Sequence, residues 1–240
     1  MNTIKIPDKK QVKIVAHRGC SGLEQENTNA AFVAAGNRSY FGIETDIHAT
    51  ADGNFIIIHD DTTTRVAGDT LVVEESTYKE LRNLQLLQKD GNKGRTDLRL
   101  SNLEEYIGLC KYYDKVAVLE LKGNLTKEAV WEICDRIQAM DYLENVIFIS
   151  FARMNLIYVR EKLPNQQAQY LVGNLKEEDY ALLLKYHFGL DIYYPKLTQE
   201  LVERCHKDGI KVNCYTCDNV ADAERLISYG VDFITSNILE

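Results

Sequence analysis

Short apolar runs rich in β-branched residues alternate along the chain with longer segments in which apolar residues recur every three or four positions. The short runs have the length and composition of buried strands. They fall at residues 12–16, 43–47, 117–121, 146–150, 167–172, 190–194, 211–216 and 232–236. The longer segments predict amphipathic helices, which lie between most of these strands at residues 28–38, 126–140, 153–162, 176–187, 198–208 and 219–228.

Strands that alternate with helices in this way indicate βαβ units and a parallel sheet. Eight of them predict an α/β fold of the closed type, the (β/α)₈ or TIM barrel, although a doubly wound open sheet has the same local pattern. The 240 residues suit one barrel, and no linker, repeat or low-complexity segment interrupts them. We therefore expect a single domain over residues 1–240.

One stretch departs from the alternation. Asp52 and Gly53 form a turn signal between two strand-like segments, which predicts a hairpin that extends the second barrel strand. Residues 61–115 then contain polar turns and two helix candidates, at 76–88 and 101–112. We interpret about 61–115 as an insertion in one βα loop, at the end of the barrel where active sites are built.

Ionisable residues lie near the carboxyl-terminal ends of the predicted strands. Glu44 and Asp46 are two residues apart in one strand, so both side chains point to the same face. The other such residues are His17 and Arg18 after the first strand, His59 at the end of the hairpin, and Glu120 and Lys122 at the end of the third barrel strand. Because the strand ends of a barrel converge on one mouth, we expect these residues to be neighbours.

Three carboxylates at one mouth repel one another unless a cation lies between them. A hard divalent cation with oxygen ligands, Mg²⁺ or Ca²⁺, fits this set, whereas zinc prefers more His or Cys. Taken singly, each residue also has an ordinary structural explanation, such as a solvated strand face, or a helix N-cap for Asn27 or Thr28. It is their joint placement at strand ends that favours a metal site.

Composition narrows the function classes. A net charge of −8 argues against non-specific binding of nucleic acid or anionic membranes. The first residues lack an apolar signal-peptide core, and no apolar run has the length of a membrane span. The chain has six cysteines, Cys20, Cys110, Cys134, Cys205, Cys214 and Cys217. We expect them to be free buried thiols in a reducing compartment, the cytoplasm. We expect no zinc site at the CxxC pair.

Short motifs follow one another between Val15 and Arg65. They are His17-Arg18-Gly19, Glu26-Asn27-Thr28, Glu44-x-Asp46, Thr50-x-Asp52-Gly53 and His59-Asp60. In this order they closely resemble the opening of the glycerophosphodiester phosphodiesterase family, and residues 100–107, 119–122, 149–151 and 230–236 extend the similarity over nearly the whole chain. Gln25 stands where the family usually has proline, Thr235-Ser236 replaces a common Thr-Asp, and Tyr215 replaces a frequent tryptophan, which bears on substrate preference.

The resemblance implies hydrolysis of small glycerophosphodiesters to glycerol 3-phosphate and an alcohol. It assigns one divalent cation, Mg²⁺ or Ca²⁺, to Glu44, Asp46 and Glu120. It further assigns the phosphate to Arg18 and Lys122, and general acid–base catalysis to His17 and His59, without deciding which of the two is the base. In the family the glycerol hydroxyl is thought to attack first and give a cyclic phosphate that water opens. No nucleic-acid partner and no stable membrane insertion are expected, and the oligomeric state is left open.

Two other functions remain as alternatives. A phospholipase D-like activity on lysophospholipids or sphingomyelin uses a similar barrel and metal site, but it needs an apolar entrance. The mostly polar residues 87–97 of the insertion favour a small soluble diester instead. A catalytically silent binding barrel is the other alternative, and none of the paired histidines or carboxylates has been lost to support it.

Overall fold

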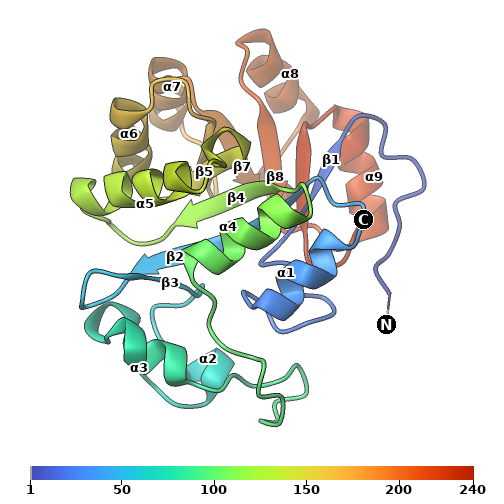
Figure 1. Cartoon of the computed structure of the whole chain (residues 1–240). Helices are drawn as coiled ribbons and strands as arrows, with labels where there is room; N and C mark the ends of the chain where they lie inside the picture. The colour runs from blue at the N-terminus through green and yellow to red at the C-terminus, as the bar shows by residue number, and fades with distance from the viewer. Residues whose placement is uncertain (1) are drawn as a thin grey trace.

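A closed barrel of parallel strands forms the centre of the computed structural model, which describes residues 2–240 (Figure 1). All strands except β3 pair in parallel, and β1 pairs with both β2 and β9, which closes the barrel. The strands are β1 (Lys13–Ala16), β2 (Gly42–Ala49), β3 (Phe55–Ile57), β4 (Val116–Leu121), β5 (Val146–Ser150), β6 (Ala168–Val172), β7 (Gly189–Tyr193), β8 (Val212–Tyr215) and β9 (Phe233–Ser236). The predicted (β/α)₈ barrel is confirmed, and the closure excludes an open sheet.

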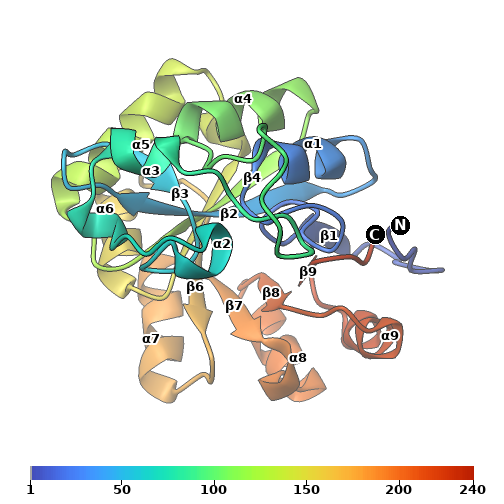
Figure 2. The ribbon, with the colours of Figure 1, turned by 90° about the horizontal axis from the view of Figure 1, so that it is seen from below.

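Helices surround the strands (Figure 2). They are α1 (Asn29–Gly36), α2 (Thr64–Ala67), α3 (Tyr78–Asn83), α4 (Leu103–Tyr112), α5 (Lys127–Ala139), α6 (Arg153–Lys162), α7 (Glu177–Tyr186), α8 (Gln199–Lys207) and α9 (Val220–Tyr229). Residues 2–240 also form three short 3₁₀ turns, η1 (Val73–Glu75), η2 (Leu143–Asn145) and η3 (Tyr194–Lys196). Side chains of Thr or Asn cap the first turns of α1, α5, α8 and α9, where helix N–H groups lack backbone partners.

One predicted helix is shorter than expected. The apolar spacing predicts a helix over 76–88, but α3 ends at Asn83 and Leu84 is extended. The next residues bond to other segments, since the N–H of Leu86 donates to the carbonyl of Leu98 and that of Leu87 to Val66. These tertiary hydrogen bonds replace the helical ones, so the spacing of leucines here reflects burial in two different elements.

Apolar side chains fill both faces of the barrel wall. The largest cluster lies between strands and helices, and a smaller one lies inside the barrel, with Val15, Val118, Ile147, Ile149, Leu171 and Phe233 as its buried members. On β4, Val118 is two residues before Glu120, so both side chains point to the interior. The apolar interior cluster therefore supports the polar residues that follow it along the strands.

The hairpin predicted at Asp52-Gly53 is present, because β2 and β3 pair antiparallel with Ala49 opposite Phe55. After β3 the chain forms a small lobe that contains α2, η1 and α3 (Figure 1). The lobe has its own apolar cluster, made of Ile56, Ile58, Val66, Ala67, Val73, Leu81, Leu86, Leu98 and Leu100. The chain then returns through α4, which packs against α1.

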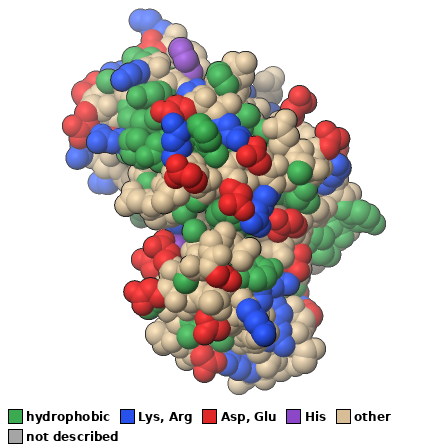
Figure 3. Space-filling model, turned by 60° about the vertical axis from the view of Figure 1, so that its left-hand side comes forward, with side chains coloured by type: hydrophobic (Ala, Val, Ile, Leu, Met, Phe, Trp, Pro, Cys, Tyr) green, Lys and Arg blue, Asp and Glu red, His purple; other side chains and the backbone are tan. Residues whose placement is uncertain are grey.

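Acidic and basic side chains are interspersed on the face shown in Figure 3, rather than gathered by sign. All six cysteines are buried and free. Among the helices formed by residues 2–240, none is both long and apolar enough to span a bilayer.

Candidate active site

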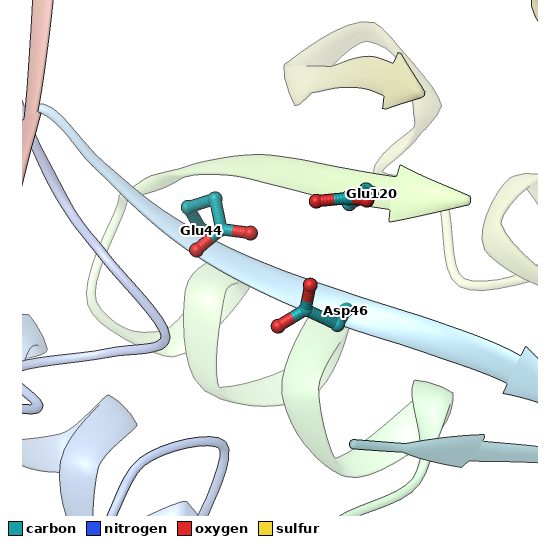
Figure 4. Close-up of side chains that lie close together, drawn as sticks. All are labelled: Glu44, Asp46 and Glu120. Atoms are coloured by element: carbon teal, nitrogen blue, oxygen red, sulfur yellow. The ribbon is translucent and has the colours of Figure 1, made fainter. Parts of the chain in front are cut away.

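Three buried carboxylates meet at the barrel interior. Glu44 and Asp46 come from β2 and Glu120 from β4, and the parallel register places Asp46 beside Glu120. One oxygen from each of the three lies within 4.8 Å of the others, and the side chains point toward one another (Figure 4). The predicted alternation of Glu44 and Asp46 therefore delivers both to the same place, where Glu120 joins them.

Burial and mutual repulsion shape the protonation of these carboxylates. Burial raises the pKa of Glu44 well above its usual range, and the charges of Asp46 and Glu120 raise it further. Burial, with Asp46 beside it, raises the pKa of Glu120 to about 7. Burial also acts to raise the pKa of Asp46, but Lys122 and Arg18 hold it below its usual value. The cluster concentrates more negative charge than its neighbours neutralise, which is the electrostatic condition for a cation site.

The donors also fit a hard divalent cation. All three residues offer carboxylate oxygen, the ligand that Mg²⁺ and Ca²⁺ take in proteins. Oδ1 of Asp46 is buried and accepts no hydrogen bond in the described chain, although Nζ of Lys122 lies 3.5 Å from it. A buried acceptor without a partner is costly unless a ligand or ion completes its environment. The Glu44, Asp46 and Glu120 cluster can therefore hold a metal.

The loop after β1 brings His17 and Arg18 to the same site. Nδ1 of His17 lies 2.8 Å from Oδ1 of Asn237, and Nε2 lies 4.0 Å from an oxygen of Glu44. Burial, helped by the positive charge of Arg18, lowers the pKa of His17 to about 4. Because the amide oxygen of Asn237 can only accept, Nδ1 carries the proton and Nε2 is a free acceptor. His17 is thus a neutral imidazole with its basic nitrogen facing the carboxylates.

Gly19 lets this loop turn against α1. Its φ is +75°, and a β-carbon there would lie 2.7 Å from the backbone carbon of Ala31. Only glycine combines that backbone conformation with so close an approach. The turn directs the backbone N–H of Arg18 onto Glu44 at 2.8 Å, so the His-Arg-Gly motif also orients a carboxylate of the cluster.

Asn27 and Thr28, left open as helix caps by the sequence, have separate tasks. Thr28 is the N-cap of α1, where its hydroxyl accepts from the N–H of Ala31. Asn27 is buried, donates from Nδ2 to Oδ2 of Asp46 at 2.8 Å, and accepts from the Thr45 hydroxyl at 2.7 Å. The amide therefore fixes the rotamer of Asp46, one of the three clustered carboxylates.

Two cations lie against the carboxylates. Nζ of Lys122 is 2.9 Å from Glu120 and 3.5 Å from Asp46. Nη1 of Arg18 donates to Glu26 at 2.8 Å, while its Nε is 3.6 Å from Asp46 and has no hydrogen-bond partner within residues 2–240. A partly buried guanidinium with a free donor is suited to bind an anionic oxygen.

A chain of ion pairs connects Arg18 to His59. Glu26 accepts from both Arg18 and Arg65. Arg65 also donates two hydrogen bonds to Asp60, at 2.7 and 3.0 Å, and Asp60 contacts Nδ1 of His59 at 2.7 Å. Arg65 belongs to α2, so the first helix of the lobe holds two motif residues in place at the barrel mouth.

These residues surround a cavity of about 190 Å³. Its lining is His17, Arg18, Glu44, His59, Glu120, Ile149, Phe151, Leu171, Asp191, Tyr215, Thr216 and Thr235. Asp46 and Lys122 lie directly behind this lining, in contact with Glu120. Larger hollows, of about 480 and 570 Å³, lie at the opposite end of the barrel, away from the carboxylate cluster. All seven residues singled out in the sequence are thus brought together at one mouth.

Several residues of this site had no functional role predicted from the sequence. Asn27 and Asp60 stand inside recognised motifs, so the motifs themselves were the signal for them. Asn237 contacts His17 across 220 residues, and Arg65 reaches Glu26 across 39 residues. Asp191 lies alone among apolar residues of a strand, LDIY, and that isolation was a signal for an interior polar site.

Comparison with known proteins identifies the family. The sequence pattern of the glycerophosphoryl diester phosphodiesterase family matches residues 17–239. A glycerophosphodiester phosphodiesterase of Caldanaerobacter subterraneus subsp. tengcongensis is 31% identical over 227 residues, which cover 93% of each chain. A glycerophosphodiester phosphodiesterase of Bacillus subtilis is 25% identical, with 96% of this chain and 84% of its own length covered.

Solved structures share the barrel. A glycerophosphodiester phosphodiesterase from Parabacteroides distasonis has a TM-score of 0.78 at 28% identity, covering 96% of this chain and 94% of its own. A phosphodiesterase from Oleispira antarctica in complex with the product sn-glycerol-3-phosphate has a TM-score of 0.83 at 24% identity, covering 94% and 93%. With a matching family pattern over nearly its whole length, this protein is an enzyme that belongs to the glycerophosphoryl diester phosphodiesterase family.

Proposed function

We propose that the enzyme hydrolyses small glycerophosphodiesters to glycerol 3-phosphate and a free alcohol. One observation carries this proposal: a buried carboxylate cluster, two histidines and two cations all meet at one cavity of about 190 Å³. The names of its relatives point to the same reaction. We also propose that residues 1–240 act as a single barrel domain, with about 61–115 as an insertion beside its mouth.

One divalent cation, Mg²⁺ or Ca²⁺, is the proposed cofactor, with Glu44, Asp46 and Glu120 as its ligands. The all-oxygen donor set supports this assignment, and so does Oδ1 of Asp46, which accepts no hydrogen bond in the described chain. A bound cation supplies a Lewis acid that stabilises negative charge on a phosphate oxygen. The two ions differ in size and in coordination number, and both accept carboxylate ligands.

Arg18 and Lys122 are the proposed phosphate-binding residues. The free Nε of Arg18 supports this role, because the guanidinium is held on its other side by Glu26 and keeps a donor available. Lys122 adds a point charge beside Glu120. The positive charges of Arg18 and Lys122 would allow a chain of net charge −8 to bind an anionic diester at an acidic barrel mouth.

His17 and His59 are the proposed acid–base pair. In the first step one histidine takes the proton of the attacking glycerol hydroxyl, and the other gives a proton to the departing alcohol oxygen as its bond to phosphorus breaks. This step yields a cyclic phosphate. In the second step the roles reverse. The histidine that gave up a proton takes one from water, which attacks phosphorus, and the other histidine returns a proton to the ring oxygen as its bond to phosphorus breaks, which gives glycerol 3-phosphate. Asn237 accepts a hydrogen bond from Nδ1 of His17 and Asp60 accepts one from Nδ1 of His59, which holds the two rings for this exchange.

The test is release of glycerol 3-phosphate from purified enzyme. Diesters of choline, ethanolamine, inositol and glycerol are offered with Mg²⁺, with Ca²⁺ and with a chelator. We expect release with at least one metal, its loss in chelator, and its recovery when metal is restored. Absence of release, with metal binding shown by calorimetry, would overturn the proposal. Lysophospholipids and sphingomyelin then test the lipid alternative, and no release from them leaves a binding barrel.

A further inference from the structure

The cavity has two unlike walls. The wall formed by β1, β2, β4 and the end of the hairpin is charged, and together with Asp46 and Lys122 directly behind it this wall supplies all the residues used by the proposed function. The opposite wall, formed by β5 to β8, contains Phe151, Leu171, Asp191 and Tyr215. No residue of this second wall takes part in the proposed reaction, although these residues line the same small cavity.

Aromatic rings gather at the rim of the second wall. The rings of Phe151 and Tyr215 lie 6.1 Å apart at an interplanar angle of 88°, and those of Tyr193 and Tyr215 lie 6.4 Å apart. The hydroxyl of Tyr215 donates to the carbonyl of Val172, which fixes its ring across the mouth. Phe151 and Tyr193 are nevertheless 49% and 45% exposed. Large apolar rings left exposed together at a cavity mouth indicate a surface that a ligand covers.

Asp191 lies in the same wall, below these rings. It is 1% exposed and is paired in register with Asn213, which donates to its Oδ2 at 3.0 Å. Its other oxygen, Oδ1, is buried without a hydrogen-bond partner in the described chain. Asp191 and Tyr193 share a face of β7, as Asn213 and Tyr215 share a face of β8. A carboxylate with an unused acceptor therefore lies directly beneath an aromatic rim.

Charge restricts what this wall can bind. Burial raises the pKa of Asp191 well above its usual value, and Glu120 adds to that effect, so the ionised form of Asp191 is favoured only when a positive charge lies beside it. An anionic group at this wall would be repelled by the carboxylates of Asp191 and Glu120. A purely apolar group would leave Oδ1 of Asp191 without a partner. A cationic group satisfies the carboxylate and also gains from the negative faces of the aromatic rings.

We propose that Phe151, Tyr193, Tyr215 and Asp191 form the subsite for the leaving alcohol, and that they select alcohols with an alkylammonium group. This inference rests on the proposed function, which places the phosphate at the charged wall. The hydroxyls of glycerol match the polar groups of that wall, so the alcohol on the other side of the phosphate faces the aromatic wall. Asp191 and the rings are thus specificity residues, separate from the acid–base pair.

A pair of nearly isosteric substrates tests the charge preference. One is glycerophosphocholine, and the other is its 3,3-dimethylbutanol analogue, in which carbon replaces the charged nitrogen. We expect kcat/KM to be about tenfold higher for the choline diester, the scale of a desolvated cation–π contact with a carboxylate beside it. Equal values for the two diesters, or a preference for the neutral one, would overturn the subsite.

Variants locate the preference on named residues. We expect Asp191→Asn and Phe151→Leu each to lower the choline-to-neutral ratio severalfold, whereas Tyr112→Leu, at an exposed ring on α4, leaves the ratio as in wild type. Thermal unfolding confirms that each variant is folded. If Asp191→Asn lowers kcat/KM equally for both diesters, the carboxylate serves the shared glycerol phosphate and the proposal is wrong.

A binding measurement separates this inference from the proposed reaction. Calorimetry with the two diesters, in chelator to prevent turnover, compares their dissociation constants for wild type and Asp191→Asn. We expect tighter binding of the choline diester to wild type and a smaller difference in the variant. If this holds while no diester is hydrolysed with metal, the proposed function fails and the subsite stands. If glycerol 3-phosphate is released but the two diesters bind with equal dissociation constants, the proposed function stands and the subsite is wrong.

Discussion

Nδ1 of His59 lies 2.7 Å from Oδ1 of Asp60, the next residue in the chain. Asp60 is itself held by two hydrogen bonds from Arg65. An ionised carboxylate only accepts, so the Nδ1 proton stays on His59 and Nε2 is left for the cavity that the ring lines. Two adjacent motif residues thus form a hydrogen-bonded pair, in which Asp60 orients the ring of His59.

Replacing this carboxylate should therefore lower turnover without removing a catalytic group. In Asp60→Asn the amide can donate to Nδ1 and favour the wrong tautomer of His59. We expect kcat to fall by about tenfold to a hundredfold, the usual effect of losing such an orienting partner. Asp61→Asn, at an exposed neighbour, is the control. Equal kcat values for both variants and wild type would show that Asp60 does not position His59.

The two histidines should each be necessary for turnover. We expect His17→Ala and His59→Ala to lower kcat by at least about a hundredfold, the scale of general acid–base catalysis. His206→Ala, at an exposed ring that pairs with Asp232 at the other end of the barrel, should retain wild-type turnover. Steady-state kinetics with a saturating metal concentration make the comparison. Near-normal turnover in either active-site variant would remove that histidine from the mechanism.

Metal binding should be visible in thermal unfolding. We expect Mg²⁺ or Ca²⁺ at about a hundred times its dissociation constant to stabilise wild type by about 2.7 kcal/mol, and thus to raise Tm by several degrees. Glu120→Gln should lose most of this shift, while Glu75→Gln, at an exposed position in η1, should keep it.

Another variant, Glu44→Gln, tests the repulsion within the cluster. In chelator, Glu44→Gln removes one of three mutually repelling buried carboxylates, and we expect its Tm to equal or exceed that of wild type. A clear drop in Tm under these conditions would mean that the ionised Glu44 side chain stabilises the metal-free fold.

Two glycines with similar backbone conformations should respond differently to alanine. Gly19 and Gly53 have φ of +75° and +74°, but only Gly19 is crowded by Ala31. We expect Gly19→Ala to lower the free energy of unfolding by about 2–4 kcal/mol, from backbone strain plus overpacking. Gly53→Ala should cost about 1 kcal/mol, from strain alone. Urea unfolding measures both, and equal losses would contradict the crowding at Gly19.

The ion pairs of Arg65 should make the free energy of unfolding depend on pH in the acidic range. Hydrogen bonds from Arg65 lower the pKa of Asp60 below its usual value, so the pair contributes stability above the unfolded pKa, near 4, and loses it as pH falls through the folded pKa. Because the Arg65 side chain is 47% exposed, we expect only about 0.5–1 kcal/mol. The difference in unfolding free energy between wild type and Arg65→Met should therefore shrink from pH 6 toward pH 3. A difference that stays constant would point to packing instead.

Local patterns in the sequence predicted much of the fold. Alternation of apolar runs with amphipathic segments is imposed by burial on each element separately, so it can be read without knowing what each element packs against. The Glu44-x-Asp46 spacing is of the same kind, since strand geometry alone puts both side chains on one face. The helix predicted at 76–88 shows the limit, because Leu86 and Leu87 bond to Leu98 and Val66 rather than to their own turn.

The sequence by itself determined which elements form, which faces are buried, and which ionisable residues stand at strand ends. Only the tertiary structure decided their partners: Asn27 with Asp46, Asn237 with His17, Arg65 with both Glu26 and Asp60. It also placed the lone Asp191 opposite the charged wall of the cavity. The physical reason is that burial and alternation act within a single element. Contacts across a barrel depend on strand register and closure, which join residues far apart in the chain.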